Sequence, residues 1–356
     1  MPATIKDVAL AAGVSVATVS RAVNGASNVL PETRQRILDA VRALRFTPSG
    51  AARSLITRRT DTIGAILPDL HGEYFSELIR GLDQAARARG LHLLVSSSHG
   101  TSDETAAALR AMNGRVDGLI VMSPHADAAF LAHNLPANLP AVLVNTGVDL
   151  PGHIQFVVDN FGGATEMTRH LLESGRSRIA FIRGPEGNHE SIERLRGYRA
   201  GMQQGQQEQQ EIIFDGDFTQ EAGWATGQRI ATLAVQPDAI FASNDMMAIG
   251  CMAALSAAGL RVPEDIAVVG FDDIPMARYL TPALTSVRVP IAALGANALN
   301  ALVDIVEMPA VGAAHPNKPQ PMIVMPVELV VRHSCGSTPP QLKTSMQRVN
   351  STRRKY

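Results

Sequence analysis

The sequence of 356 residues holds only two cysteines, one tryptophan and 4% aromatic residues. The cysteines, Cys251 and Cys335, lie far apart, and no CxxC pattern, HExxH pattern or His/Cys cluster accompanies them. Widely spaced single cysteines are typical of free thiols in a reducing compartment rather than of a disulfide framework. We therefore expect two free thiols, and neither a metal site nor a cofactor.

The sequence also lacks a charged-then-apolar leader and any apolar run of 18 residues. Export requires such a leader, and a membrane-spanning helix needs about 20 consecutive apolar residues. We therefore expect a cytoplasmic protein that neither is exported nor spans a membrane. The hydrophobic content of 46% is that of a globular protein, and the length allows two or three domains.

The net charge of −1 conceals a strong asymmetry along the chain. Residues 1–60 carry a net charge of +6 and residues 329–356 another +6, whereas residues 61–328 carry −13. A basic segment suits a polyanion such as DNA, and an acidic body does not. This charge pattern favours a DNA-binding head attached to a body that gains nothing from phosphate contacts.

The first thirty residues have the pattern of a helix-turn-helix. Thr4 and Asp7 are placed for a capping box, a turn follows at Gly13, and a second helix begins at the capping residue Ser15. A third helix is expected over 32–44. Apolar residues are spaced to close a small core between the first two helices and to give the third helix one apolar face: Val8, Ala9, Val14, Val19, Val23, Ile37, Leu38, Val41 and Leu44. The alternative is a purely structural helical hairpin, against which the basic charge of this segment argues.

The outer face of the second helix is small, polar and basic, as a face that enters the DNA major groove must be. Val16 and Ala17 cannot donate hydrogen bonds and suit thymine methyl groups, whereas Arg21 can bond guanine or a phosphate. These three are the expected base contacts. Phosphate contacts, which fix the register of the protein on DNA, are expected from Lys6, Ser15, Thr18, Asn24 and Ser49.

From residue 62 the chain alternates between apolar strands and helices. Strands are expected at 62–68, 91–97, 118–123, 140–145, 179–183, 212–214, 239–243 and 266–271, and helices at 75–89, 102–113, 126–134, 161–174, 191–201, 219–234 and 246–258. Continuously apolar strands separated by helices are typical of parallel sheets covered on both faces. We therefore expect an α/β protein with two lobes built on doubly wound parallel sheets. The Gln-rich residues 203–210 are expected to form a solvated loop, and residues 335–356 a disordered basic tail.

Polar residues follow several of the expected strands at their carboxyl ends, where doubly wound folds bind ligands. Carboxylates and amides at these ends suit sugar hydroxyls, which need both donors and acceptors. Contacts to a small-molecule effector are expected from Asp69, Tyr74, Arg194, Phe218, Asn244 and Asp272. Phe218 either stacks on a sugar or fills the lobe, and Asn244 either binds or caps a helix. His71 is a ligand contact or a loop residue, and we expect Asp245 and Asp273 to cap helices.

A series of motifs occurs in a fixed order along the chain. They are Ile5-Lys6-Asp7-Val8-Ala9, Gly13-Val14-Ser15-Val16-Ala17-Thr18-Val19-Ser20-Arg21, Pro31-Glu32-Thr33-Arg34, Ala52-Arg53-Ser54-Leu55, Arg194-Leu195-Arg196-Gly197-Tyr198, Ser243-Asn244-Asp245-Met246-Met247-Ala248, Val268-Val269-Gly270-Phe271-Asp272-Asp273 and Leu284-Thr285-Ser286-Val287. On these motifs the chain resembles the LacI/GalR family of bacterial transcription regulators over about residues 4–334.

The resemblance implies a periplasmic-binding-protein-like core whose two lobes are joined by three crossovers, a homodimer, and a small-molecule effector in the cleft. It also implies that residues 49–60 are a hinge helix that folds on DNA, with Leu55 wedged into the minor groove. Without the resemblance this short basic linker could equally be a passive spacer. Ser49 stands where the family usually has Asn, and Gly50 opposes helix formation by about 1 kcal/mol.

The expected organisation is a helix-turn-helix domain at 1–48, a hinge at 49–60, a core at 61–334 and a tail at 335–356. Within the core, the first lobe is expected to take 61–158 and 287–321, and the second lobe 159–286 and 322–334. The expected function is that of a transcription regulator, a repressor that binds a pseudo-palindromic DNA operator and whose affinity is modulated by a sugar or related metabolite.

Two other classes of protein share parts of this pattern. The paired carboxylates Asp272 and Asp273 invite a glycosidase interpretation, but adjacent residues on one turn rarely flank a single bond. No GxSxG, Walker or strand-following GxGxxG sequence is present. A secreted sugar-binding protein would share the core, but it needs a leader and would not carry residues 4–45.

Overall fold

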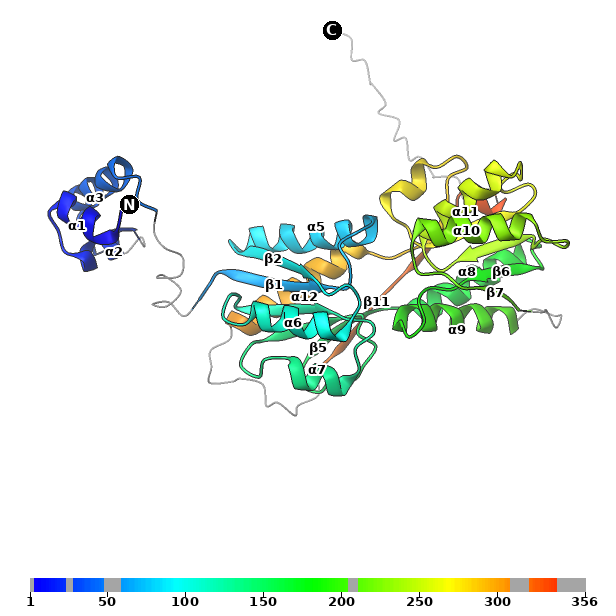
Figure 1. The fold of residues 1–356 in the computed structure, drawn as a ribbon, viewed down its shortest axis with the longest axis horizontal. Coiled ribbons are helices and arrows are strands. Elements are labelled where there is room, and N and C mark those ends of the chain that lie inside the picture. The colour runs from blue at the N-terminus through cyan, green and yellow to red at the C-terminus, as the bar shows by residue number, and fades with distance from the viewer. Residues whose placement is uncertain (1–2, 24–27, 48–58, 204–210, 308–319, 338–356) are drawn as a thin grey trace, which may run out of the picture. The chain divides into compact units, whose positions relative to one another are not determined.

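The computed structural model describes residues 3–23, 28–47, 59–203, 211–307 and 320–337 (Figure 1). The chain divides into two units, of which the first holds Met1–Thr62 with Arg115–Asp117 and the second holds the rest. Residues 3–47 are called the head below, and the second unit is called the core.

The head contains three helices, α1 (Ile5–Ala12), α2 (Val16–Val23) and α3 (Pro31–Ala43). The expected capping box at the start of α1 is confirmed, because Thr4 N donates to Asp7 Oδ2 at 2.8 Å. Gly13 ends α1 in the left-handed conformation at φ 65°, which glycine adopts without steric cost. Ser15 Oγ then accepts from Thr18 N at 3.2 Å and caps α2, as expected.

Small apolar side chains from all three helices and the loop before α3 form the core of the head: Val8, Ala9, Ala12, Val19, Ala22, Val29, Ile37 and Ala40. The expected apolar face of α3 is partly wrong, since Leu38 and Leu44 are exposed and Ala40 is buried in their place. Ile37, Ala40 and Val41 follow the i, i+3, i+4 spacing of one helix face, and Leu38 lies beside that face.

The core contains two six-stranded sheets. The first has the order β11-β5-β4-β3-β1-β2, and the second the order β12-β10-β9-β8-β6-β7. The first sheet is built from β1 (Thr62–Leu67), β2 (His92–Ser97), β3 (Gly118–Met122), β4 (Ala141–Val144), β5 (Ile154–Val158) and β11 (Met322–Met325). The second sheet is built from β6 (Ile179–Ile182), β7 (Ile212–Phe214), β8 (Ala239–Ala242), β9 (Ala267–Asp272), β10 (Thr285–Arg288) and β12 (Glu328–Val330).

The pairing within these sheets is mainly parallel, as the apolar strands predicted. In the second sheet β6, β7, β8, β9 and β10 pair in parallel, and only the edge strand β12 runs antiparallel to its neighbour β10. In the first sheet β3 pairs in parallel with β1 and β4, and β5 with β4 and β11. The carboxyl ends of these strands therefore meet at one edge of each sheet.

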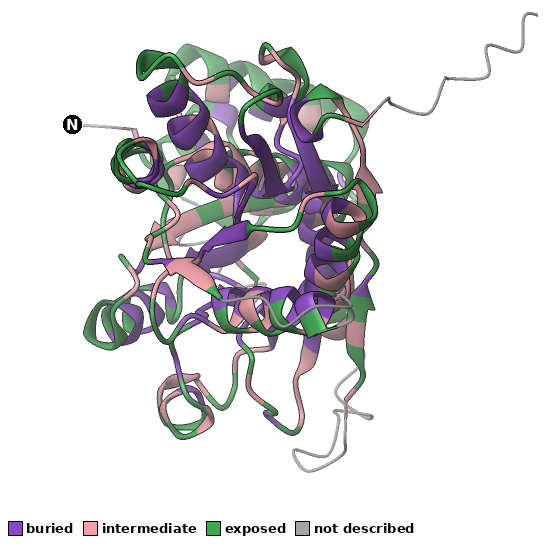
Figure 2. Ribbon diagram, turned by 90° about the vertical axis from the view of Figure 1, so that its right-hand side faces the viewer, coloured by how far each residue is buried: buried purple, intermediate pink, exposed green. Residues whose placement is uncertain are grey.

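Helices cover both faces of each sheet (Figures 1 and 2), so that the central strands are buried. In the first lobe α5 (Glu73–Ala88) packs against α12 (Ile291–Glu307), and α6 (Ser102–Met112) against α7 (Ala128–Asn134). In the second lobe α8 (Asn160–Glu173) packs against α9 (His189–Gln203), and α10 (Gln220–Ala231) against α11 (Asp245–Ala257). The 3-10 helices are η1 (Pro275–Tyr279) and η2 (His333–Cys335).

The chain passes between the lobes three times, after β5, after β10 and after β11. These crossovers differ from the expected lobe boundaries at two places. Met322–Met325 pairs with β5 and lies in the first lobe, although we expected it in the second. Residues 287 and 288 belong to β10 of the second lobe, although we expected them in the first. Both segments are short, and only their pairing partners reveal the lobe to which they belong.

The end of the described chain is more ordered than expected. The expected disordered tail began at residue 335, yet Cys335 is buried within η2 and Ser334 Oγ donates to Val268 O at 2.6 Å. Both cysteines are free, as expected, and both are buried. Residues 338–356 and the Gln-rich residues 204–210 lie outside the described residues. Within the described ranges, no helix is long and apolar enough to cross a membrane, and no group of His, Cys, Asp and Glu is arranged to hold a metal ion.

Candidate functional site

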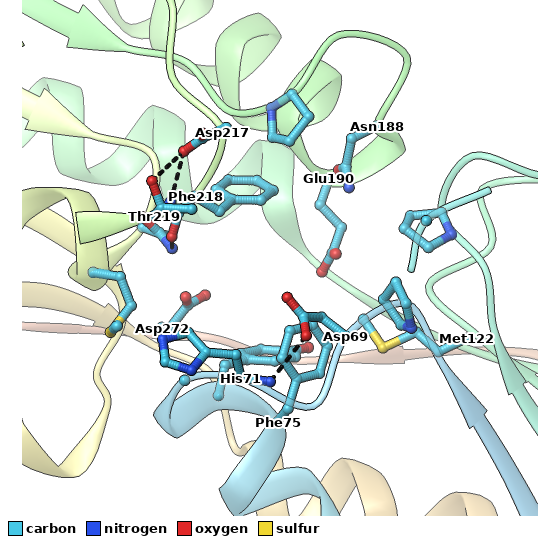
Figure 3. Close-up of a pocket in the computed structure, with 18 of the residues that line it drawn as sticks. Asp69, His71, Phe75, Met122, Asn188, Glu190, Asp217, Phe218, Thr219 and Asp272 are labelled. Carbon is cyan, nitrogen blue, oxygen red and sulfur yellow. Dashed lines mark hydrogen bonds between the residues drawn. The ribbon is translucent and has the colours of Figure 1, made fainter. Parts of the chain in front are cut away.

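A cavity of about 450 Å³ lies between the two lobes of the core (Figure 3). Its lining comes from the loops that follow β1, β2, β3, β6, β7 and β8, from the end of β9, and from the first turns of α5, α9, α10 and α11. The cavity thus lies where the strand ends predicted a binding site. All six expected effector residues line it, Asp69 and Tyr74 from the first lobe and Arg194, Phe218, Asn244 and Asp272 from the second.

Arg194 of α9 contacts several other residues of the cavity wall and its surroundings. Its side chain is 3% exposed, and Nε donates to Asn160 Oδ1 at 2.8 Å. One terminal nitrogen donates to Ser243 O at 2.6 Å, and the other lies 3.1 Å from Asp272 Oδ1. The guanidinium also stacks over the ring of Phe271, 3.9 Å from its centroid. Arg194 is therefore held rigidly, with a carboxylate beside it at the cavity wall.

Asp272 is the last residue of β9, and its φ of 107° lies in a region that residues other than glycine rarely adopt. The residue is 4% exposed, and its Oδ1 lies 3.1 Å from a terminal nitrogen of Arg194. Burial raises the pKa of Asp272 to about 7, in spite of the opposing attraction of Arg194. A strained, buried carboxylate of this kind at a cavity is typical of a functional position.

Glu190 also lines the cavity, and sequence analysis did not single it out. It is 6% exposed, lies 3.7 Å from Arg194, and accepts a hydrogen bond of 2.8 Å from Asn145 Nδ2. Burial raises the pKa of Glu190, while Arg194 and the bond from Asn145 oppose that shift. A signal for Glu190 was present, because it precedes Arg194 by four residues and so shares its helix face.

Asp245 and Asp273 were expected to cap helices, and both expectations are wrong. The side chain of Asn244, and not that of Asp245, caps α11 by accepting from Met247 N at 3.0 Å. Asp245 is fully buried and accepts from Ser286 Oγ and from Ile274 N at 2.9 Å. Asp273 does not cap a helix either, because its carboxylate pairs with Arg288 and Arg332.

Three aromatic side chains complete the lining, Phe218 from the second lobe and Tyr74 and Phe75 from the first. Phe218 has φ at 71°, and a Cβ added at Gly184 would collide with its ring. Figure 3 shows the rings of Phe218 and Phe75 on opposite sides of the hollow, with the carboxylates of Asp69, Glu190 and Asp272 pointing into it. Burial and the Glu190 carboxylate raise the pKa of the Tyr74 hydroxyl well above its usual value.

The second candidate site is the outer face of α2 in the head. Val16 is 40% exposed, and Ala17 and Arg21 are also exposed, so the three expected base contacts share one accessible face. Lys6 is exposed as well. Ser15 and Thr18 bond each other through their hydroxyls at 2.8 Å at the start of α2. Asn24, Ser49 and Leu55 lie outside the described residues, and so does most of the expected hinge, residues 49–58. Thr60, at the end of the expected hinge, is described and is not helical.

The chain matches two family models, "Bacterial regulatory proteins, lacI family" over residues 4–49 and "Periplasmic binding protein-like domain" over residues 168–335. Among curated relatives, the HTH-type transcriptional repressor PurR of Erwinia tasmaniensis is 38% identical over 306 residues, covering 85% of this chain and 90% of the relative. The HTH-type transcriptional regulator CelR of Thermobifida fusca is 34% identical over 309 residues, covering 85% and 91%.

Solved structures show the same similarity. A structure of the lac repressor dimer bound to operator and the anti-inducer ONPF superposes with a TM-score of 0.81 at 28% identity, covering 94% of this chain and 99% of that one. A complex of the transcriptional regulator CelR with cellobiose superposes with a TM-score of 0.68 at 31% identity, covering 93% and 99%. Both the head and the two-lobed core of this chain therefore have counterparts of known structure.

Proposed function

This chain belongs to the LacI family of bacterial regulatory proteins, and from that premise we propose that it is a repressor whose affinity for its operator changes when a sugar or related metabolite fills the inter-lobe cavity. The observation that carries this proposal is the cavity itself, which is lined by polar and aromatic residues from both lobes: Asp69, Tyr74, Arg194, Phe218, Asn244 and Asp272. The head supplies the DNA reader, and the core supplies the sensor.

In the head, we assign base recognition to Val16, Ala17 and Arg21. Val16 and Ala17 offer methyl groups to thymine, and Arg21 offers a fork of donors to guanine. Lys6, Ser15 and Thr18 lie beside this face or at the start of α2, where a helix N-terminus attracts phosphate. Asn24 and Ser49 are proposed as further phosphate contacts, and Leu55 as the residue that inserts into the minor groove.

In the core, the two lobes meet around the cavity, so a ligand that contacts both lobes stabilises one relative arrangement of them. A ligand shifts such an equilibrium only by its differential affinity for the two arrangements. A homodimer, the state in which the similar lac repressor was solved, presents two readers to a pseudo-palindromic site. A change between the lobes then alters the operator affinity of the dimer.

The proposal assigns no catalytic step to this chain. Asp272 and Asp273 diverge, because Asp272 faces the cavity and Asp273 is paired with Arg288 and Arg332. Two carboxylates that flank a glycosidic bond must instead face one another across it. As a regulator of DNA transcription, the protein is proposed to work in the cytoplasm.

The test is selection of genomic DNA fragments by the purified full-length chain at moderate salt. We expect a small set of fragments that share a pseudo-palindrome, with affinity that falls steeply as salt rises. Sugars are then added to the complex with the selected fragment, and at least one is expected to change its affinity. Retention of random fragments without a common sequence contradicts the proposal.

A further inference from the structure

The inter-lobe cavity has an acidic wall. Among the described residues, its lining includes five carboxylates and, of the Lys and Arg side chains, Arg194 alone. The carboxylates are contributed by both lobes: Asp69, Glu190, Asp217, Glu221 and Asp272. The negative potential of this wall would repel a ligand that carries a phosphate or a carboxylate, unless a cation of the wall is available to pair with that group.

Arg194 is not such a free cation. Its three nitrogens are directed at Asn160 Oδ1, Ser243 O and Asp272 Oδ1, at 2.8, 2.6 and 3.1 Å. Its single positive charge faces two buried carboxylates, because Glu190 lies 3.7 Å away on the same helix. The buried cluster of Arg194, Asp272 and Glu190 therefore has one carboxyl group more than it has cations.

The same cluster offers acceptors to a ligand. Asp272 is 4% exposed and lines the cavity, where its carboxylate has Arg194 as its cationic partner at 3.1 Å. Glu190 accepts a side-chain hydrogen bond from a neutral amide, that of Asn145. Hydroxyl and ammonium groups donate hydrogen bonds to such oxygens, whereas an ionised phosphate or carboxylate only accepts. The aromatic rings of Phe218 and Phe75 add apolar faces and attract cations.

From this charge pattern, and building on the proposed function, we propose that the cavity selects sugars that are neutral or carry an amino group and excludes phosphorylated and carboxylated sugars. We assign the selection to Glu190, the carboxylate that is in excess over Arg194. Asp272 has the shorter distance to Arg194, 3.1 Å against 3.7 Å, and so takes the larger share of its charge. Glu190 is left as an uncompensated negative charge at the cavity wall.

The test uses the full-length protein without DNA in titration calorimetry at pH 8. The probes are matched sets built on common hexoses and disaccharides, each with the parent sugar, its amino analogue, its 6-phosphate and its acid. We expect the tightest binder to be a neutral or amino sugar, with its phosphate weaker by about 100-fold or more. A phosphate or acid that binds as tightly as its parent overturns the proposal, and so does a panel in which no neutral or amino sugar binds.

The substitution Glu190→Gln removes the excess charge and keeps an oxygen that can accept from Asn145. We expect this substitution to reduce the affinity ratio between the parent sugar and its phosphate by at least about tenfold. Glu193→Gln is the matched control, because Glu193 lies on the same helix, pairs with Arg196 at the surface and is not part of this cavity. If the affinity ratio between the parent sugar and its phosphate is the same in the parent protein and in Glu190→Gln, Glu190 does not determine the selection. Circular dichroism must show that both variants are folded.

Failure of this inference and failure of the proposed function give different results. If anionic sugars bind best and still change operator affinity, the regulator is retained and the charge preference is wrong. If neutral sugars bind in the cavity but leave operator affinity unchanged, the charge preference stands and the ligand control of DNA binding is wrong.

Discussion

The carboxylate of Glu190 and the side-chain amide of Asn145 are joined by a hydrogen bond of 2.8 Å that crosses from the second lobe to the first. Two further bonds cross in the same way, from His189 N to Pro124 O at 3.3 Å and from Met276 N to Glu73 Oε2 at 2.9 Å. One residue of the cavity wall therefore also holds the lobes together. A ligand that engages Glu190 alters a contact between the lobes directly.

Asn145→Ala is expected to destabilise the core by about 1–3 kcal/mol. The substitution removes the donor to Glu190 and also the acceptor for Val158 N, which Asn145 Oδ1 holds at 3.2 Å. Both partners are buried, so each is left without its bond in a place that water does not reach. Urea unfolding followed by circular dichroism measures the change. Asn134→Ala, which removes only a side-chain bond to Phe130 O on α7, is the control, and an equal loss in the two variants contradicts the bridging role.

The stability of the core is expected to depend on pH through Asp272. Burial raises the pKa of this carboxyl to about 7, from about 3.9 in an unfolded chain. A raised pKa means that the protonated form is favoured in the folded state. The stabilisation is thus complete below about pH 4 and is lost as the pH rises through 7. We therefore expect Asp272→Asn to remove part of the decline in melting temperature between pH 5 and pH 8.

The matched control for that pH series is Asp215→Asn, because Asp215 is an exposed partner of Arg183 outside the cavity. Its melting curve is expected to follow the parent protein across the whole range. If the melting temperature of Asp272→Asn also runs parallel to that of the parent between pH 5 and pH 8, Asp272 is ionised throughout this range, and burial does not raise its pKa as stated.

Arg21→Ala is expected to weaken binding to the selected operator by about 1–3 kcal/mol, the magnitude of one good base contact. The side chain lies exposed at the end of α2, on the face that also carries Val16 and Ala17. Fluorescence anisotropy with a labelled operator measures the loss. Arg36→Ala, an exposed arginine on α3, removes the same charge from the head and serves as the control. A greater loss in Arg36→Ala would transfer the contact from α2 to α3.

Much of the cavity could be predicted because strand ends are marked in the sequence. The apolar runs before Asp69, Asn244 and Asp272 end where these polar residues begin, and parallel pairing then brings the ends to one edge. Asn145 also follows an apolar strand, β4, whereas Glu190 is marked only by its helical spacing from Arg194, and neither pattern predicts that the two side chains meet. Their contact depends on how the two lobes face each other, and no local pattern in either segment carries that information.

Strands β5, β10, β11 and β12 and helix α12 were the other parts of the core that were not predicted from the sequence. β11 and β12 have four and three residues and lie at the edges of their sheets, where Met322 and Val324 of β11 and Glu328 of β12 are exposed. α12 was not predicted either, although its sequence carries the signal of an amphipathic helix. Asn297, Asn300, Asp304 and Glu307 recur at helical spacing on one side, and the apolar residues on the other side are buried.

The last prediction concerns how the cavity controls DNA binding. Arg194 is a poor position for this test, because its removal leaves Asp272 and Glu190 as uncompensated buried charges, which costs about 3–5 kcal/mol. Phe218 is a better position, because it is half-buried and its ring faces the hollow. Phe218→Ala is expected to raise the effector concentration for half-maximal change in operator binding by about tenfold or more, since a buried phenyl ring contributes about 1.5–3 kcal/mol. Operator affinity without effector is expected to stay unchanged, because the head is untouched. Phe161→Ala, which removes a ring of 39% exposure outside the cavity, is the control. If Phe218→Ala responds to the effector like Phe161→Ala, the effector acts from a site other than this cavity.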